Sequence, residues 1–270
     1  MASDSATAMY RTRPDALTTD VGEGRPVVFA HGTLMDRTMF APQLEALRDE
    51  YRAVAYDLRA RTDRYAPGYD LWDLADDCAA LLDGINEDSA VIAGMSMGGF
   101  TALRFALAYP ERVDGLVLID TTAVPHTDEE RETFSELVDP FEGSRDPIPR
   151  ELAEGSTAEL FGETTRAEKP DLVESWVDRW ATYPGAAVYH ELNSWLGRAD
   201  VTDRLPEIDV PTLVVHGEED PSLPPSRAEP MVEELPDADL ELIPEAGHTA
   251  NLERPDLVND AIRSFLDERF

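Results

Sequence analysis

Short runs of apolar residues recur along the chain, and most are continuous rather than alternating with polar residues. Continuous runs of this length are typical of strands covered on both faces, as in a parallel sheet. The predicted strands are Pro26–His31, Ala53–Asp57, Ala90–Met95, Gly115–Asp120, Pro211–His216 and Leu240–Ile243. Residues before Pro26 are expected to add one or two antiparallel edge strands.

Between these runs, apolar residues repeat with the period of an amphipathic helix. The predicted helices are Pro42–Glu50, Leu71–Ile85, Met97–Tyr109, Pro225–Leu235 and Pro255–Arg269. Strands that alternate with helices predict an α/β fold with a doubly wound, mostly parallel sheet.

The alternation is interrupted between residues 122 and 205, which contain helical pieces such as Arg131–Val138 and Leu172–Trp180 but no typical strand. Roughly 80 residues is far longer than an ordinary connection between a helix and a strand. We therefore expect a core formed by residues 1–121 and 206–270, with residues 122–205 inserted as a helical cap over the site.

The predicted cap contains Trp176, Trp180 and Trp195. Large aromatic side chains in such a segment either line an apolar pocket or hold its helices together. Both roles remain open for each of the three residues.

The charge of the chain narrows its possible partners. Among 270 residues there are 56 acidic and 23 basic side chains, a formal net charge of −33, and Lys169 is the only lysine. A field this negative repels phosphate backbones and acidic membrane surfaces, so we expect no nucleic-acid or membrane partner. Because molar salt would relieve the self-repulsion, the composition favours a halophilic protein.

Other features favour a cytoplasmic protein. Cys78 is the only cysteine, so no internal disulfide can form, which fits a reducing interior. No apolar run approaches the ~20 residues that a membrane span needs. Residues Met1–Tyr10 are polar and lack the basic-then-apolar order of a signal peptide.

A G-x-S-x-G pattern runs from Gly94 to Gly98, between a predicted strand and a predicted helix. This strand–turn–helix setting is the one that a nucleophile elbow requires. In so tight a turn, side chains at positions 94 and 98 would clash with neighbouring backbone, hence the glycines. We therefore expect Ser96 to be a nucleophile, with the amino end of the helix stabilising an oxyanion.

A serine nucleophile needs a general base, and five histidines are candidates. His248 follows the last predicted strand, which places it at the same sheet edge as Ser96, and we expect it to be the base. The others are expected elsewhere, with His31 shaping the oxyanion loop, His216 packed at a strand end, and His126 and His190 exposed in the insertion or touching substrate.

The acid that orients the base is expected to be Asp220, which follows the predicted strand Pro211–His216. The order Ser96, Asp220, His248 is the one found in this class of hydrolase. Other acids lie near strand ends, and the alternatives are Asp120, Glu218 and Glu219.

Two backbone N–H groups should bind the oxyanion. One is expected from Met97, the residue after the nucleophile. The other is expected from Thr33, in the loop after the first long strand, with Leu34 as the alternative.

Several motifs together resemble the α/β-hydrolase superfamily over about residues 26–268. They are His31-Gly32, Tyr56-Asp57-Leu58-Arg59, Gly94-Met95-Ser96-Met97-Gly98-Gly99, Val215-His216-Gly217-Glu218-Glu219-Asp220 and Ala246-Gly247-His248. The group it resembles contains small esterases, enol-lactonases and cofactor-free haloperoxidases, and residues Gly247–Pro255 are similar to 3-oxoadipate enol-lactonases. The resemblance implies a two-step acyl transfer on a small molecule, without metal or organic cofactor.

The chain departs from this family at one loop. After Arg59 such families usually continue with Gly-His-Gly, whereas this chain continues with residues 60–63, Ala-Arg-Thr-Asp. Epoxide hydrolases and haloalkane dehalogenases carry an aspartate where Ser96 stands, which disfavours both activities.

The first functional hypothesis is hydrolysis of a small carboxylic ester or lactone through an acyl-enzyme on Ser96. Hydrolysis of a C–C bond in a dienoate from aromatic-ring breakdown is an alternative, which a basic residue in the pocket would favour. Perhydrolysis is a further variant. A non-catalytic binding protein is least expected, because all three residues of the predicted triad are present.

Overall fold

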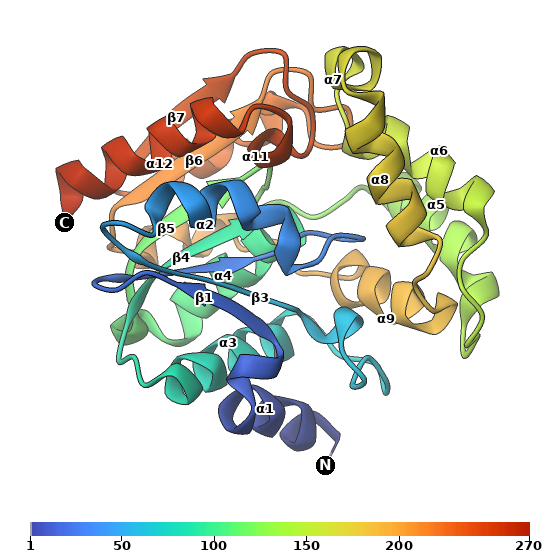
Figure 1. Cartoon of the computed structure of the whole chain (residues 1–270), viewed down its shortest axis with the longest axis horizontal. Coiled ribbons are helices and arrows are strands. Elements are labelled where there is room, and N and C mark those ends of the chain that lie inside the picture. The colour runs from blue at the N-terminus through green and yellow to red at the C-terminus, as the bar shows by residue number, and fades with distance from the viewer. Residues whose placement is uncertain (1) are drawn as a thin grey trace.

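The computed structural model describes residues 2–270, with side chains described from Ser5 onward. Its centre is a seven-stranded sheet in the order β1-β3-β2-β4-β5-β6-β7 (Figure 1). β1 runs antiparallel to β3, and the other neighbouring strands are parallel. The strands are β1 (Thr18–Val21), β2 (Pro26–Ala30), β3 (Arg52–Tyr56), β4 (Ala90–Met95), β5 (Val113–Ile119), β6 (Thr212–Gly217) and β7 (Ala238–Ile243).

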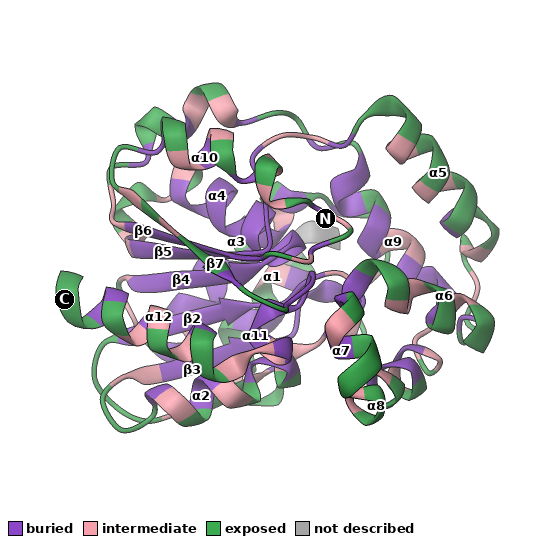
Figure 2. Ribbon diagram, turned by 90° about the horizontal axis from the view of Figure 1, so that it is seen from above, coloured by how far each residue is buried: buried purple, intermediate pink, exposed green. Residues whose placement is uncertain are grey.

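Helices cover both faces of this sheet. Figure 2 shows α3, α4 and α10 on one side, and α2 and α12 on the other. These helices, with α1 and α11, are α1 (Ala2–Thr12), α2 (Ala41–Leu47), α3 (Leu71–Ile85), α4 (Met97–Ala108), α10 (Glu229–Glu234), α11 (Ala250–Glu253) and α12 (Pro255–Arg269). The prediction of an α/β fold with a doubly wound, mostly parallel sheet is confirmed.

The burial of the strands explains their sequences. Every residue of β4 is buried, as is every residue of β2, because both strands lie in the middle of the sheet between two helical layers. β7 lies at the edge, and five of its six residues are half-buried or exposed. Continuous apolar runs therefore mark the strands that are covered on both faces, while polar residues enter at the edge that faces solvent.

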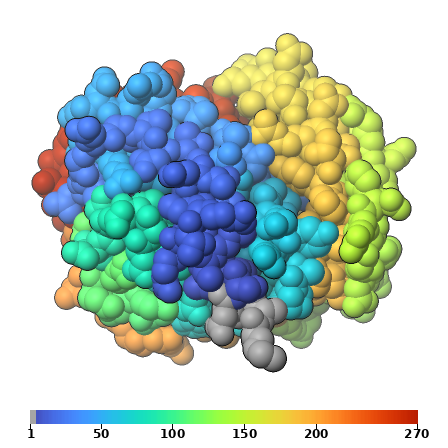
Figure 3. Space-filling model, turned by 60° about the horizontal axis from the view of Figure 1, so that its bottom comes forward, coloured from blue at the N-terminus to red at the C-terminus, as the bar shows by residue number. Residues whose placement is uncertain are grey.

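Two elements differ from the sequence-based prediction. α1 was not predicted, yet it packs against α3, and the N-terminal segment covers this face of the molecule (Figure 3, dark blue). Tyr10 of α1 is buried, and its hydroxyl donates to the carbonyl of Asp57 at 2.9 Å. The predicted helix Pro225–Leu235 begins only at Glu229, after a separate 3-10 turn. The cause is Pro230, which lacks an N–H donor and fits only the first turn of a helix.

Between β5 and β6 the chain forms five helices, which we call the helical insertion. They are α5 (Asp128–Val138), α6 (Arg150–Leu160), α7 (Glu163–Glu168), α8 (Pro170–Trp180) and α9 (Gly185–Leu196). The helical insertion lies to one side of the sheet, facing the carboxyl ends of the parallel strands (Figure 1). The two helical pieces predicted here fall within α5 and α8, whereas α6, α7 and α9 were not predicted. No helix in the described part of the chain is long and apolar enough to cross a membrane.

Candidate active site

Ser96 occupies the turn between β4 and α4, with φ at 50° and ψ at −113°. A positive φ is rare outside glycine and marks a strained turn held by its surroundings. A Cβ on Gly94 would lie 2.2 Å from the carbonyl oxygen of Gly98, and one on Gly98 would lie 2.0 Å from that of Ala30. The close approach of β4, α4 and β2 therefore requires both glycines of the G-x-S-x-G pattern.

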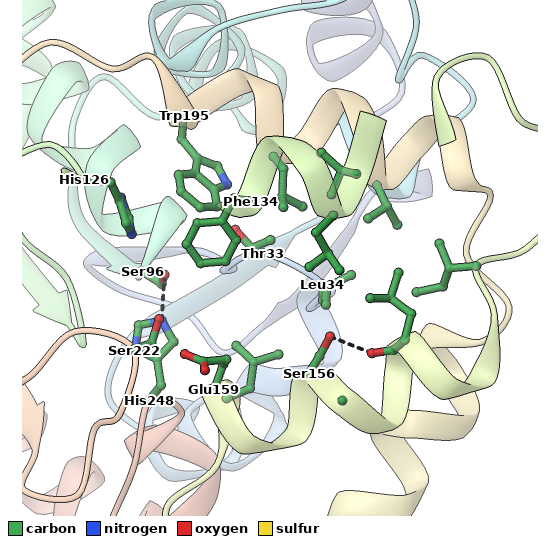
Figure 4. A pocket seen from close by; sticks show the side chains of 18 of the residues that line it. Thr33, Leu34, Ser96, His126, Phe134, Ser156, Glu159, Trp195, Ser222 and His248 are labelled. Atoms are coloured by element: carbon green, nitrogen blue, oxygen red, sulfur yellow. Dashed lines mark hydrogen bonds between the residues drawn. The ribbon is translucent and has the colours of Figure 1, made fainter. Parts of the chain in front are cut away.

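Ser96, His248 and Asp220 form a continuous chain of hydrogen bonds. With the imidazole proton assigned to Nδ1, His248 donates to Asp220 Oδ2 at 2.7 Å, and its Nε2 accepts from Ser96 Oγ at 2.9 Å. All three side chains are buried. They come from the loops after β4, β7 and β6, which meet at the carboxyl edge of the sheet (Figure 4 shows the Ser96–His248 bond). The predicted nucleophile, base and acid are thus brought together.

The electrostatics of these three hydrogen-bonded residues favour the charged form of the His248 imidazole. Burial by itself lowers the pKa of His248, but the Asp220 carboxylate outweighs it, and the pKa of His248 is raised above its ordinary value. Burial likewise opposes ionisation of Asp220, yet His248 and His216 together lower the pKa of Asp220 to about 2. An ionised acid behind the imidazole is what stabilises the imidazolium when a serine gives up its proton.

The loop after β6 fixes the orientation of Asp220. Its Oδ1 accepts hydrogen bonds from the N–H groups of Ser222 and Leu223, at 2.9 and 2.8 Å. His216 is buried as expected, but its Nε2 also lies 3.2 Å from Asp220 Oδ2 and 2.7 Å from the carbonyl oxygen of Leu223. The acid therefore has two histidine neighbours, a feature that the sequence did not indicate.

Asp120, the alternative acid, has a different position. Its Oδ1 accepts from the N–H of Gly217 at 2.8 Å, and its Oδ2 accepts from the N–H of Ala250 at 2.9 Å. Burial raises the pKa of Asp120 to about 7, and Asp220 adds to the rise while His216 opposes it. Asp120 therefore ties the loops after β6 and β7 to the end of β5, rather than bonding to the imidazole of His248.

One group of described residues has the spacing of a metal site, namely Asp120, His216 and Asp220. Each residue offers one ligand atom, and these atoms lie within 4.8 Å of one another. The four carboxylate oxygens already accept hydrogen bonds from backbone N–H or imidazole groups. This cluster therefore acts as a hydrogen-bond network, with the oxygen lone pairs directed at protons.

The loop after β2 lies beside Ser96. A Cβ on Gly32 would lie 2.3 Å from Met95 Sδ and 3.3 Å from the Cβ of Ser96, so this loop approaches the nucleophile closely. The N–H groups of Thr33 and Met97 make no hydrogen bond to any described residue. Leu34, in contrast, has φ at 63° and donates its N–H to Glu191 Oε2 at 3.2 Å. Of the two candidates in this loop, Thr33 is thus the one whose N–H is available.

A cavity of about 430 Å³ opens beside Ser96 and His248. Its walls are mainly aliphatic and aromatic side chains of the helical insertion and of the strand-end loops (Figure 4). They include Leu34, Phe100, Phe134, Leu137, Val138, Ile148, Leu152, Leu160, Val188, Leu192, Trp195 and Leu223. A wall of this composition suits an apolar group attached to a reacting carbonyl.

Two expectations about the insertion need correction or refinement. His126 was expected to be exposed or to touch substrate. It is not exposed: it is buried, lines the cavity and accepts a hydrogen bond from Arg198 at 2.7 Å. Burial and Arg198 lower the pKa of His126 to about 3, so its ring is neutral at pH 7. Of the three tryptophans, Trp195 lines the cavity, whereas Trp176 and Trp180 pack against each other away from it.

The charges on the cavity wall are acidic. Glu151 and Glu159 of α6 contribute to the lining, and no lysine or arginine is found among the described lining residues. Neither glutamate is buried, so they sit where the cavity meets solvent.

Comparisons with known proteins agree with this fold. A family model for the alpha/beta hydrolase fold matches residues 25–255. The chain is 30% identical to a putative non-heme chloroperoxidase of Synechocystis sp. over 92% of this chain and 93% of that protein. It is 28% identical to 3-oxoadipate enol-lactonase 1 of Acinetobacter baylyi over 85% and 84% of the two chains. A thermophilic esterase from Thermogutta terrifontis superposes with a TM-score of 0.87, at 34% identity, covering 93% of this chain and 92% of that one.

Proposed function

The chain belongs to the α/β-hydrolase fold family, and from this premise we propose that it is a serine hydrolase acting on neutral carboxylic esters with an apolar acyl group. The observation that carries the proposal is the hydrogen-bonded chain Ser96–His248–Asp220 at one end of an apolar cavity. The resemblance to an esterase at 34% identity supports the same reaction class.

The proposed reaction has two acyl-transfer steps. His248 Nε2 takes the proton of Ser96 Oγ while this oxygen attacks the ester carbonyl carbon. The N–H groups of Thr33 and Met97 stabilise the resulting oxyanion, and Asp220 stabilises the imidazolium. When the tetrahedral intermediate collapses, the C–O bond breaks and the alcohol leaves with the proton from His248. Water then attacks the acyl-enzyme while His248 accepts its proton. The bond from the acyl carbon to Ser96 Oγ breaks, His248 returns the proton to Ser96 Oγ, and the carboxylic acid is released.

The cavity wall supports a neutral acyl group. A carboxylate carried into this space would lose its hydration without meeting a cation, because the described lining contains no lysine or arginine. The dienoate expected for C–C hydrolysis carries a carboxylate, and so does 3-oxoadipate, the product that the name 3-oxoadipate enol-lactonase gives. Binding either compound in this cavity would cost the hydration of a carboxylate. We therefore place ester hydrolysis ahead of those alternatives.

The test is release of p-nitrophenol from p-nitrophenyl butyrate by wild type, Ser96→Ala and Ser175→Ala. Ser175 lies in α8 with its hydroxyl bonded to the carbonyl of Leu172, outside the cavity, and serves as the matched control. Ser96→Ala is expected to lower kcat by about 10⁶-fold, as loss of the nucleophile does in serine hydrolases. Turnover that survives in Ser96→Ala, or that is absent from a folded wild type, would contradict the proposal.

A further inference from the structure

The loop that departs from the family pattern contains an unusual ion pair. Arg61 lies where such families usually have the histidine of Gly-His-Gly, and its Nη2 is 2.5 Å from Glu191 Oε2 of α9. The two side chains are 4% and 0% exposed. The pair therefore joins the loop after β3 to the helical insertion in the interior of the protein.

The same carboxylate oxygen has a second donor, since Glu191 Oε2 also accepts the N–H of Leu34. Arg61 is itself held in place, because its Nε donates to the carbonyl of Met35 at 2.8 Å and its guanidinium lies 3.8 Å from the centre of the Tyr183 ring. One oxygen of Glu191 thus links the altered loop, α9 and the loop beside Ser96.

Such a pair is not explained by stability alone. Removing two charges from water costs free energy that their attraction often only balances, so buried pairs add little net stability. Burial raises the pKa of Glu191, while Arg61 and the Leu34 N–H oppose that rise by favouring the carboxylate. What the pair does fix is the direction of one backbone N–H, that of Leu34.

We propose that Glu191, oriented by Arg61, is a positioning residue for the oxyanion hole. By capturing the N–H of Leu34, it holds this residue in its left-handed conformation and leaves the N–H of Thr33 facing the reacting carbonyl. This inference rests on the proposed function. Glu191 does not touch the substrate, and its effect passes through the backbone of the loop.

The position of α9 gives this arrangement a further consequence. Val188, Leu192 and Trp195 of the same helix line the cavity, so α9 contacts the acyl group as well as the oxyanion loop. A shift of the helix caused by a poorly fitting acyl group would move the carboxylate of Glu191 too. Acyl fit is therefore expected to influence kcat in addition to KM.

Two double variants separate the role of the hydrogen-bond acceptor from that of the ion pair. R61M/E191Q and R61M/E191L both remove the charges together, which is far less disruptive than breaking the pair. The two variants differ in the hydrogen-bond acceptor at position 191. The E191Q side chain keeps an oxygen that can accept from the N–H of Leu34, whereas the E191L side chain has no acceptor. Relative to R61M/E191Q, R61M/E191L is expected to lose about 10- to 100-fold in kcat, as a displaced oxyanion donor does.

The kinetic change is expected in kcat, with KM for p-nitrophenyl butyrate similar in the two double variants. R61M/E191L is also expected to have the lower Tm, because the buried N–H of Leu34 loses its acceptor, so kcat is compared at a temperature at which both variants are folded. Equal kcat values in the two variants would overturn the role of Glu191. That outcome differs from failure of the proposed function, in which wild-type turnover would be absent or would survive Ser96→Ala.

If both double variants fail to fold, a measurement on wild type tests whether the N–H of Leu34 is held by Glu191 while that of Thr33 is free to bind an oxyanion. Amide hydrogen exchange is compared in the free protein and after binding a trifluoromethyl ketone, which forms an oxyanion on Ser96. The Leu34 amide is expected to be protected in both states, and the Thr33 amide only with the inhibitor. Protection of Leu34 that appears only with the inhibitor would overturn the proposal.

Discussion

The sheet edge and the helical insertion contribute to the site in different ways. At the sheet edge, Ser96, Asp220 and His248 contact one another directly, and Asp120 ties the loops that carry the last two. The helical insertion supplies most of the cavity wall and both acidic lining residues. Under the proposed function, this difference is a division of labour in which the strand-end loops carry the reacting residues and the insertion selects the substrate.

The two regions also differ in how their residues are buried. Strands such as β4 are buried at every position, whereas α5 buries only Val138 among its eleven residues. Figure 2 shows exposed residues along the outer sides of α5, α6 and α8. The sheet edge is therefore the more constrained region, and substitutions there should have the larger effects.

The largest effect is expected from Asp220→Asn at the sheet edge. An amide cannot stabilise the imidazolium and favours the wrong tautomer of His248, so kcat should fall by about 10⁴-fold. Glu219→Gln is the matched control, because the Glu219 side chain points to Thr164 instead. Steady-state kinetics with p-nitrophenyl butyrate check both variants, and similar losses would contradict the assignment of Asp220.

The pH dependence should follow the imidazole of His248. This group acts as a base only when neutral, and its pKa is raised above 6.5 by Asp220 against the effect of burial. kcat/KM is therefore expected to rise with pH, with a midpoint above pH 6.5 and a fall of about 10-fold for each pH unit well below it. A midpoint below pH 6.5 in wild type would contradict this electrostatic description.

Asp120→Asn should affect stability more than chemistry. An asparagine can accept from only one of Gly217 and Ala250, and the other N–H would face an amide donor. An unsatisfied buried donor costs about 1–3 kcal/mol in the free energy of unfolding. Urea unfolding measures this loss. A variant that keeps its stability but loses kcat as Asp220→Asn does would make Asp120 the functional acid.

The smallest effect is expected in the helical insertion, from E151Q/E159Q. Removing these solvent-facing charges should raise kcat/KM for p-nitrophenyl hemisuccinate relative to p-nitrophenyl butyrate by about two- to five-fold, the usual size of an exposed charge interaction. The gain should disappear in about 1 M KCl, where the Debye length is about 3 Å. A wild type that prefers the anionic ester would contradict both the predicted neutral substrate and the division of labour.

The sheet was more predictable than the insertion for a physical reason. Continuous apolar runs identified β2 to β6 with each end placed within two residues, since burial on both faces leaves a strong local signal. The positions of Ser96 after β4, Asp220 after β6 and His248 after β7 followed from the topology. In contrast, α9 was not predicted, because buried polar residues such as Glu191 and Ser194 interrupt the apolar pattern of its sequence.

Residues that act across the fold left no local signal. Arg61 and Glu191 are 130 positions apart, and nothing near either residue indicates the other. The altered loop was visible as a departure from the family pattern, but its partner was not. For His126 the sequence likewise left exposure and contact with substrate both open, because only the packed helices show that this side chain is buried.

The point of attachment of the helical insertion bears on how such proteins can be recombined. The segment leaves the sheet after β5 and returns at β6, and these two strands are neighbours, with Ile119 paired to Val215. A segment whose ends are adjacent can be exchanged as a cassette between relatives with little change to the scaffold. An exchanged segment that carries Glu191 requires arginine at position 61 of the recipient scaffold, because either residue alone would be an unpaired charge in the interior. Recombination between lineages, or by an engineer, is therefore expected to preserve the two positions as a unit.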